Sequence, residues 1–203
     1  MNTEGAHKRE KMKITPCFKT YPENPYTSGL EFNFCPKCCT KLIAMKQKGV
    51  FRKVCAKCQY IQYINPLPGV AVLIENDHKL LLGKRSQKSF LGGKWCLPCG
   101  FIEHNESFVE AACREVFEET GLSINITSLI NVSSNRLTPG LHTIVTVLMA
   151  EIGGGKLQAG DDMEKIMWVD NSVPLPELAF ESDSFIIAKY FEKVLIKIPI
   201  EAE

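Results

Sequence analysis

The chain has no long apolar segment. None of the apolar runs in its 203 residues approaches the roughly 18 residues that a membrane-spanning helix requires. The first residues, MNTEGAHKREKMK, also lack the apolar core of a secretory signal. Internal repeats and low-complexity tracts are absent as well. These absences disfavour membrane, secreted and repeat proteins, so we expect a soluble globular protein without a membrane partner.

The cysteines do not suit a disulfide framework, because their number, nine, is odd. Several of them form Cys-x-x-Cys pairs, and no signal peptide precedes them. Both features favour the cytoplasm or another reducing intracellular compartment, in which cysteines bind metal. Cys17 stands alone, and we interpret it as a free thiol.

The chain has little net charge, +1, but its distribution is uneven. Residues 1–63 carry 12 Lys and Arg against 4 Asp and Glu, whereas residues 64–203 carry 12 against 19. The basic part is either a solvated tail or a surface that attracts polyanionic substrates or nucleic acid.

Composition divides the chain into three parts. Residues 1–32 show little periodicity, and we interpret them as a flexible leader. Residues 33–65 form a compact cysteine module, which Asn65-Pro-Leu-Pro68 would connect to the rest as a stiff linker. Residues 66–203 are interpreted as one further domain.

The cysteine module contains Cys35-Pro-Lys-Cys38 and Cys55-Ala-Lys-Cys58, which are separated by 16 residues. This spacing is typical of a zinc site in which each Cys-x-x-Cys turn supplies two thiolates. Four ligands leave no position for water, so the role of the zinc would be structural, and so short a module would depend on it for stability. Cys39 could replace Cys38 as a ligand, although the Cys-x-x-Cys geometry favours Cys38.

The rest of the chain alternates strands with two helices. Strands are predicted at 69–74, 79–82, about 124–134, 141–151 and 165–170, with a turn at 76–78 and a flexible connection at 153–155. Ser107-Phe-Val-Glu110 fits a capping box and Gly121 suits the C′ position, so a helix is expected between them. A second amphipathic helix is predicted at 181–196. This α/β pattern predicts a mixed sheet covered by helices on both faces.

The most informative segment runs from Gly100 to Leu122 and has three acidic side chains near its end. Positions i, i+3 and i+4 share one face of a helix, so Glu115, Glu118 and Glu119 would project together. A hard divalent cation such as Mg²⁺ would turn their mutual repulsion into attraction. The segment therefore predicts a metal-dependent site for phosphate chemistry.

The overlapping Trp95-Cys96-Leu-Pro-Cys99 resembles the active-site motif of thioredoxins. Redox activity would need Cys96 at the N-terminus of a helix, where the dipole lowers the pKa of the thiol. The capping signal at Ser107 puts the helix too late for this, and the βαβ lead-in is missing. We expect Cys96 and Cys99 to be small, partly buried side chains on a strand.

The segment from Gly100 to Leu122 matches, position for position, the signature of the Nudix hydrolases. That signature is glycine, five residues, glutamate, seven residues, Arg-Glu, an aliphatic residue, any residue, Glu-Glu, any residue, glycine and an aliphatic residue. The resemblance extends from about Gly69 to Trp168. It implies a Nudix-type α/β/α sandwich and hydrolysis of a nucleoside diphosphate linked to another moiety. Together with the predictions above, the expected α/β fold is this sandwich, with a mixed sheet, preceded by the small four-cysteine zinc ribbon.

The resemblance also implies roles for single residues. The metal-binding carboxylates of the family, which hold Mg²⁺ or Mn²⁺, correspond to Glu115, Glu118 and Glu119, often joined by the Gly100 carbonyl. Glu118 or Glu119 could also help to activate water. A structural pair that steadies the loop and the helix corresponds to Glu106 and Arg114.

The resemblance also concerns three positions outside the signature or at its start: a candidate general base, a candidate substrate-binding cation and the residue before Gly100. The family often takes its general base from a later loop, where Glu164 is the candidate, with Asp161 and Asp162 close by. Arg85 lies where the family often has a cation facing the diphosphate, and its alternative role is a surface salt bridge. Cys99 is a departure, because a glycine commonly precedes the first glycine of the signature, and its bulk could affect the shape of the substrate cleft.

The zinc ribbon narrows the choice of substrate. NADH pyrophosphatases share this arrangement, but their Ser-Gln-Pro-Trp-Pro type motif is absent from Asn131-Val-Ser-Ser-Asn-Arg-Leu-Thr-Pro139. A second group, similar to plant enzymes acting on ADP-ribose and FAD, shares the ribbon, the Asn-Pro linker, the signature and Leu178-Ala-Phe-Glu-Ser182. ADP-ribose or FAD is therefore expected, and Arg136, Trp95 and Phe101 could contact it.

Other functions stay open. These are hydrolysis of NADH, hydrolysis of capped or triphosphorylated RNA ends with the basic ribbon holding RNA, and nucleotide sensing without catalysis. Sensors built on this scaffold usually lose signature carboxylates, and all of them are present here. The expected binding partner is a small-molecule nucleotide diphosphate, and nucleic acid is a less favoured alternative. The protein could also form a homodimer.

Overall fold

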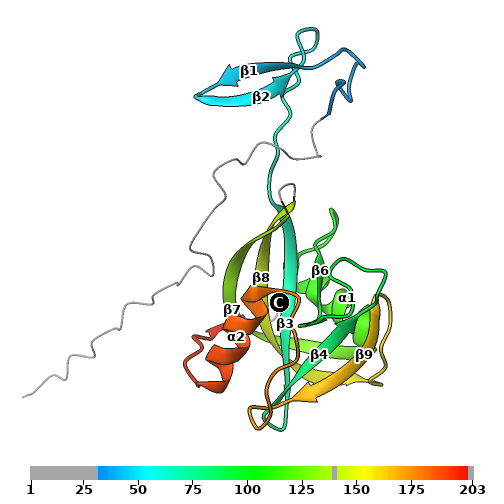
Figure 1. The fold of residues 1–203 in the computed structure, drawn as a ribbon, viewed down its shortest axis with the longest axis vertical. Helices are drawn as coiled ribbons and strands as arrows, with labels where there is room; N and C mark the ends of the chain where they lie inside the picture. Colours follow the sequence, from blue (N-terminus) through cyan, green and yellow to red (C-terminus); the bar gives the residue numbers. More distant parts are fainter. Residues whose placement is uncertain (1–31, 139–140, 201–203) are drawn as a thin grey trace, which may run out of the picture.

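The computed structural model describes residues 32–138 and 141–200. Within these ranges the protein forms a small two-stranded module and a larger body, which contains an eight-stranded sheet and two helices (Figure 1). The predicted flexible leader, with Cys17, falls outside the described residues apart from Phe32. No helix in the described part of the chain is long and apolar enough to cross a membrane.

The small module is an antiparallel pair of strands, β1 (Ile43–Gln47) and β2 (Val50–Val54). Its core is very small: Cys35, Leu42 and Cys55 are buried, and Tyr60 packs partly buried against them. Segments that bury so little apolar surface usually need a metal or disulfides to fold. The cysteines of the described residues are all free of disulfides.

The body contains eight strands and two helices. In chain order they are β3 (Leu67–Asn76), β4 (Lys79–Arg85), β5 (Trp95–Cys96), β6 (Cys99–Phe101), α1 (Phe108–Thr120), β7 (Leu122–Thr138), β8 (Leu141–Gly155), β9 (Met163–Val169), α2 (Glu181–Phe191) and β10 (Ile198–Pro199). The sheet order is β10-β7-β8-β3-β4-β5, with β6 paired to β3 and β9 paired to β4. Only β3 and β8 run parallel among these pairs, so the sheet is mixed, as predicted.

β3 lies at the centre of the sheet and is buried on both faces. Val70 and Val72 belong to the core layer that contains α1, whereas Ala71 and Leu73 belong to the layer that contains α2. Successive side chains of a strand point to opposite faces, so one strand supplies both layers. Figure 1 shows the two helices on different sides of β3. The α/β/α sandwich is confirmed.

Several element boundaries differ from those predicted. Gly153–Gly155 continues β8 instead of forming a flexible connection, because the backbone pairs with β7 without needing side chains. Leu67 and Pro68 belong to β3 and not to the linker, since they pair with β8. The second helix ends at Phe191, before residue 196, and the left-handed conformation of Lys193 (φ 59°) prevents its continuation.

α1 begins and ends at the predicted capping residues. Ser107 Oγ accepts a hydrogen bond from the Glu110 N–H at 3.2 Å, and Glu110 Oε2 accepts one from the Ser107 N–H at 2.7 Å. Gly121 follows the helix with φ 69°, which glycine adopts without a steric penalty. These two caps fix the helix and therefore the position of the acidic side chains within it.

α2 is anchored by a buried carboxylate. Asp183 is 3% exposed and accepts a hydrogen bond from the Leu97 N–H at 3.0 Å, which joins α2 to the segment after β5. Burial raises the pKa of Asp183 to about 7, although the hydrogen bond from Leu97 opposes the shift. The folded protein therefore holds a proton here at a pH at which an unfolded aspartate has lost it.

We predict that Asp183→Asn abolishes a pH-dependent part of the stability. Between about pH 4 and pH 7 the unfolded state releases the proton first, so wild-type stability should fall as the pH rises, by up to about 1.4 kcal/mol per pH unit. The asparagine variant should lack this fall. Urea unfolding of both proteins from pH 5 to pH 8 measures it, and a pH-independent difference between them would contradict the prediction.

Candidate active site

Arg114 lies at the centre of the acidic segment and uses all of its donors. Nε donates to Glu106 Oε2 at 2.9 Å, and Nη2 donates to Glu106 Oε1 and to the Phe101 carbonyl at 2.5 and 3.1 Å. Nη1 donates to Glu115 Oε1 at 2.9 Å and to Glu118 Oε2 at 3.0 Å. These five bonds correspond to the five N–H donors of a guanidinium. One side chain thus joins the loop before α1 to the acidic face of the helix.

The structure brings together the predicted pair of Glu106 and Arg114. Glu106 also accepts a hydrogen bond from the Glu103 N–H at 2.8 Å. The Arg114 guanidinium and then this N–H lower the pKa of Glu106 to about 2. Glu106 is therefore ionised at neutral pH, and two parallel N–H bonds to a carboxylate are a geometrically specific contact.

The three carboxylates proposed as metal ligands have different surroundings. The Glu118 side chain is 47% exposed, that of Glu115 only 12%, and Glu119 is buried. Glu119 Oε2 accepts a hydrogen bond from the Cys99 N–H at 2.9 Å. Burial raises the pKa of Glu115, and raises that of Glu119 well above its usual range. A nearby positive charge would favour their ionised forms.

Gly100, the first residue of the signature, lies directly against Glu115. A side chain at position 100 would overlap the Glu115 carboxylate as it now lies, so any larger residue would displace that carboxylate. Gly100 is held in place by β6, which pairs it with Val70 of β3. The central strand therefore positions the backbone that faces the acidic side of α1.

The three carboxylates of α1 do not converge on one point as closely as the cysteines of the small module do. Among the described residues, only those four cysteines form a group of possible metal ligands whose donor atoms all lie within 4.8 Å of one another. Glu115 and Glu118 point to Arg114, and Glu119 points to the Cys99 N–H. A shared cation is the interaction that would offset the repulsion between them.

Glu115 and Glu119 line a cleft of about 350 Å³, and Glu118 is not among its lining residues. Its polar lining includes Gly100, Glu115, Glu119, Asp161, Asp162 and Arg85. Its apolar lining includes Val70, Leu137, Leu141, Val145, Val147 and Phe180. Such a cleft offers both ligands for a cation and contact area for a flat apolar group. Of the aromatic and basic residues expected to contact substrate, Phe101 lines the cleft, whereas Trp95 and Arg136 do not.

Arg85 forms a salt bridge and also lines the cleft. Nη2 lies 2.7 Å from Asp162 Oδ2, and Nε donates to the Phe90 carbonyl at 2.7 Å. The side chain is only 11% exposed. These contacts fix the guanidinium at the cleft. Arg85 can therefore form the salt bridge and still face a bound substrate.

The acids considered for the general base lie in two different places. Asp161 and Asp162 line the cleft. Glu164 is exposed on β9, accepts a hydrogen bond from the Gln87 N–H at 3.2 Å, and is not among the residues that line it.

Cys96 and Cys99 lie on β5 and β6, as the sequence indicated. The chain continues from Cys99 into β6, and α1 starts only at Phe108. A hydrogen bond with Cys96 and burial raise the pKa of Cys99 well above the usual thiol range. A thiol of this kind is unreactive, which agrees with a packing role.

The four cysteines of the small module have the geometry of a zinc site. Cys35 Sγ lies 3.5 Å from Cys58 Sγ, and Cys38 Sγ lies 3.5 Å from Cys55 Sγ. Sulfur atoms around a tetrahedral zinc ion at about 2.3 Å would be roughly 3.8 Å apart. Cys39 is exposed and does not belong to this group.

Sequence reasoning missed three buried polar residues of the cleft, Asn135, Thr143 and Asp183. Alternation along the strands could have placed the first two on an inner face. Nothing in the sequence indicates that these strand positions face each other, or that α2 packs beside them.

Known proteins resemble this chain in sequence and in fold. The family model described as the NUDIX domain matches residues 65–191. An ADP-ribose pyrophosphatase of Methanocaldococcus jannaschii is 40% identical over 129 residues, which cover 63% of this chain and 75% of that protein. The NAD-capped RNA hydrolase NudC of Haemophilus influenzae is 30% identical over 168 residues, which cover 77% of this chain but only 62% of NudC.

A solved structure also resembles the fold. A NUDIX hydrolase from Nitrosomonas europaea matches with a TM-score of 0.71 and 29% identity, covering 80% of this chain and 92% of that one. The residues matched by the family model include α1 and all the residues that line the cleft. Because the family model spans more than half of the sequence, the chain belongs to the Nudix hydrolase family.

Proposed function

We propose that the protein hydrolyses the diphosphate linkage of a nucleoside diphosphate derivative, with ADP-ribose or FAD as substrate. The observation that carries this proposal is one cleft lined by Gly100, Glu115 and Glu119 of the signature together with Arg85. Ligands for a divalent cation and a fixed guanidinium are the groups that phosphate chemistry requires. Similarity to the archaeal ADP-ribose pyrophosphatase supports ADP-ribose.

The residues proposed to hold Mg²⁺ or Mn²⁺ are Glu115, Glu118, Glu119 and the Gly100 carbonyl. When bound, the cation would neutralise charge that develops on the phosphates and lower the pKa of a water ligand. The protein contributes positioning: Arg114 orients Glu115 and Glu118, and the Cys99 N–H orients Glu119. Arg85, fixed by Asp162, would face the diphosphate.

For the general base we favour Asp161 within the acidic group formed by Asp161, Asp162 and Glu164. Asp161 lines the cleft and lies near enough to Glu115 for its charge to raise the pKa of that residue. Asp162 is paired with Arg85, and Glu164 bonds to the Gln87 N–H away from the cleft.

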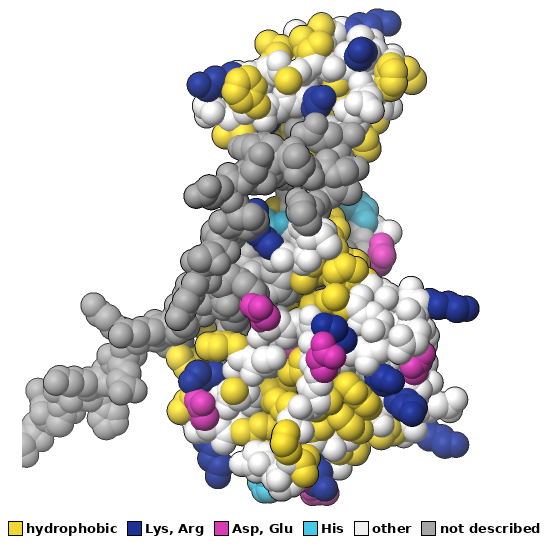
Figure 2. Space-filling view, viewed as in Figure 1, with side chains coloured by type: hydrophobic (Ala, Val, Ile, Leu, Met, Phe, Trp, Pro, Cys, Tyr) yellow, Lys and Arg dark blue, Asp and Glu magenta, His cyan; other side chains and the backbone are white. Residues whose placement is uncertain are grey.

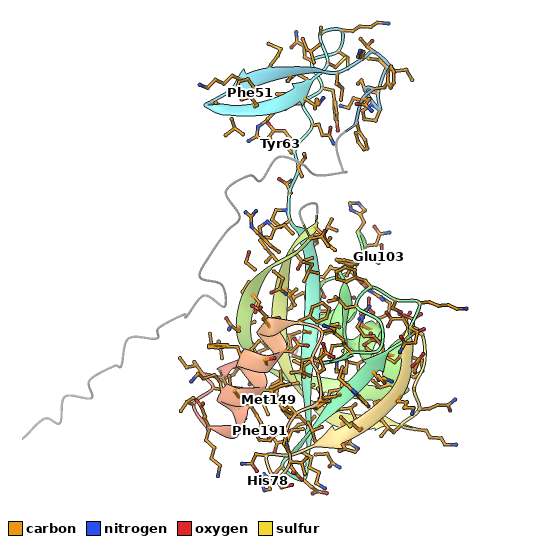
Figure 3. The ribbon with its side chains drawn as sticks, in the orientation of Figure 1. Phe51, Tyr63, His78, Glu103, Met149 and Phe191 are labelled. Carbon is orange, nitrogen blue, oxygen red and sulfur yellow. The ribbon has the colours of Figure 1, made fainter. Side chains whose placement is uncertain are left out.

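A second candidate function, hydrolysis of RNA 5′ ends, is favoured by the surface of the small module. Residues 33–65 contain seven Lys and Arg and no Asp or Glu. Phe34, Phe51 and Tyr63 are about 60% exposed, and Arg52 stacks over the Tyr63 ring at 4.7 Å. Figure 2 shows basic and hydrophobic side chains together on this module, and Figure 3 labels two of its aromatics. Basic and aromatic side chains together are typical of surfaces that bind single strands.

A turnover screen with Mg²⁺ tests both candidates. We expect hydrolysis of ADP-ribose or FAD in preference to NADH and capped RNA, with little dependence on salt. Turnover of capped RNA with a steep salt dependence would favour the second candidate, because each phosphate contact releases counterions. A protein that hydrolyses none of these compounds contradicts both.

Glu118→Gln tests the proposed metal ligands within the same assay. The loss of one fixed charge at the reacting centre should reduce kcat by roughly 10²–10³-fold. Stability should change by less than about 0.5 kcal/mol, because the side chain is half exposed. Glu151→Gln, an exposed acid on β8, is the matched control and should remain fully active. Full activity of the Glu118 variant would overturn the metal assignment.

Asp161→Asn and Glu164→Gln separate the candidate bases. We expect kcat to fall by roughly 10²-fold or more for Asp161→Asn, since general-base catalysis contributes that much. Glu164→Gln should have a much smaller effect. The measurement is kcat as a function of pH for both variants. A larger loss of kcat in Glu164→Gln than in Asp161→Asn would assign the base to Glu164.

We also propose that Cys35, Cys38, Cys55 and Cys58 bind structural zinc. Elemental analysis of protein purified without chelator should find about one zinc per chain. Cys58→Ser should lose it, because three thiolates leave the tetrahedral site incomplete. Cys39→Ser is the matched control and should keep it. Zinc retained by the Cys58 variant and lost by the Cys39 variant would reassign the ligands.

A further inference from the structure

Two buried polar side chains lie side by side in the cleft, and each has an oxygen atom without a hydrogen-bond partner among the described residues. Asn135 on β7 and Thr143 on β8 are cross-strand neighbours, and they are 6% and 3% exposed. Within the described part of the chain, Asn135 Oδ1 and Thr143 Oγ1 accept or donate no hydrogen bond. Buried polar groups are almost always satisfied, since leaving them unpaired costs free energy. The fold alone therefore does not account for these two residues.

Their surroundings show what kind of group would satisfy them. Leu137, Leu141 and Val145 line the cleft next to the pair, so its neighbours are apolar. The unpaired Asn135 Oδ1 offers an acceptor, and the unpaired Thr143 hydroxyl can both donate and accept. A matching ligand presents a donor beside an acceptor on a flat group whose faces are apolar. A phosphate, which is anionic and only accepts, does not match.

The same cleft is lined by Gly100, Glu115 and Glu119. A molecule whose diphosphate lies at these residues would have its other groups in the remainder of the cleft, part of which β7 and β8 line. Nucleobases and the nicotinamide and flavin rings all have such a donor–acceptor edge. Asparagine in particular forms paired hydrogen bonds with adenine.

We infer that Asn135 and Thr143 form a recognition pair that hydrogen-bonds the donor–acceptor edge of the heterocycle in the substrate. This inference rests on the proposed diphosphate hydrolysis and adds the residues that select the end group. The pair determines specificity and takes no part in bond cleavage. Leaving the two polar atoms unpaired destabilises the folded protein, and hydrogen bonds to the bound substrate would offset this destabilisation.

Thr143→Val and Asn135→Leu test the pair, because they remove the polar atoms and nearly keep the shapes. If the pair serves recognition, both variants should be as stable as the wild type or more stable, and kcat/KM for the preferred substrate should fall roughly 10- to 100-fold. Thr146→Val is the matched control: it changes the same residue type on the opposite face of β8 and should leave kcat/KM unchanged. Unchanged kcat/KM in both pair variants, or their strong destabilisation, would overturn the inference.

Calorimetric binding without metal identifies the heterocycle and separates the two proposals. AMP, nicotinamide mononucleotide and FMN carry the three candidate groups on similar phosphates. We expect one of them to bind the wild type at least tenfold more tightly than it binds Thr143→Val. Equal affinities of the two proteins for all three ligands would refute the pair, even if the enzyme is active. Binding that depends on the pair in a protein that hydrolyses nothing would support the pair and refute the hydrolase.

Discussion

The five hydrogen bonds of Arg114 are the interaction on which the acidic site depends. Its guanidinium joins the loop from Phe101 to Glu106 to two carboxylates of α1. Without this positive charge, the acidic side chains of the helix would repel one another and the loop would lose its attachment. A lysine could not replace it, because an ammonium has three donors and no planar fork. The arrangement therefore requires arginine at this position.

The rest of the fold positions the groups that bind the Arg114 guanidinium. The capping box at Ser107 and the left-handed Gly121 fix the two ends of α1. β3 holds Gly100 through β6, and the absence of a side chain there leaves room for Glu115. The site is thus built on regular elements around a central strand that is buried on both faces. Loops supply Asp161, Asp162, Phe90, Phe180 and the segment that joins β6 to the helix.

The cleft combines two environments that serve different parts of a substrate. Its carboxylates are partly buried, and a cation is their natural counter-charge. The lining residues that β7 and β8 contribute are apolar apart from Asn135 and Thr143. Groups suited to charged chemistry and groups suited to recognition of a flat ring therefore line one cleft. The zinc-type cysteine cluster lies in a module with its own small core and takes no part in this cleft.

Much of the site was predictable because its signals are local. The spacing of residues 100–122 placed the glutamates on one helix, the capping residues placed its ends, and the Cys-x-x-Cys pairs predicted the cysteine cluster. The partners of Arg85 and the position of Glu164 were not predictable, since they depend on how β4 and β9 pair. The sequence also failed to predict that Gly153–Gly155 belongs to a strand. These glycines pair through the backbone, and amino-acid composition does not indicate such pairing.

The sequence by itself thus determined the family signature, the helix that carries it and the ligand types of both metal-type sites. Only the tertiary structure decided which carboxylate is buried, which acids reach the cleft, and that Asn135 meets Thr143 across two strands. The physical reason is that burial and cross-strand register arise from contacts between distant segments. The sequence specifies the chemical groups of each residue. The burial of those groups and their hydrogen-bonding partners depend on how the sheet and the helices pack.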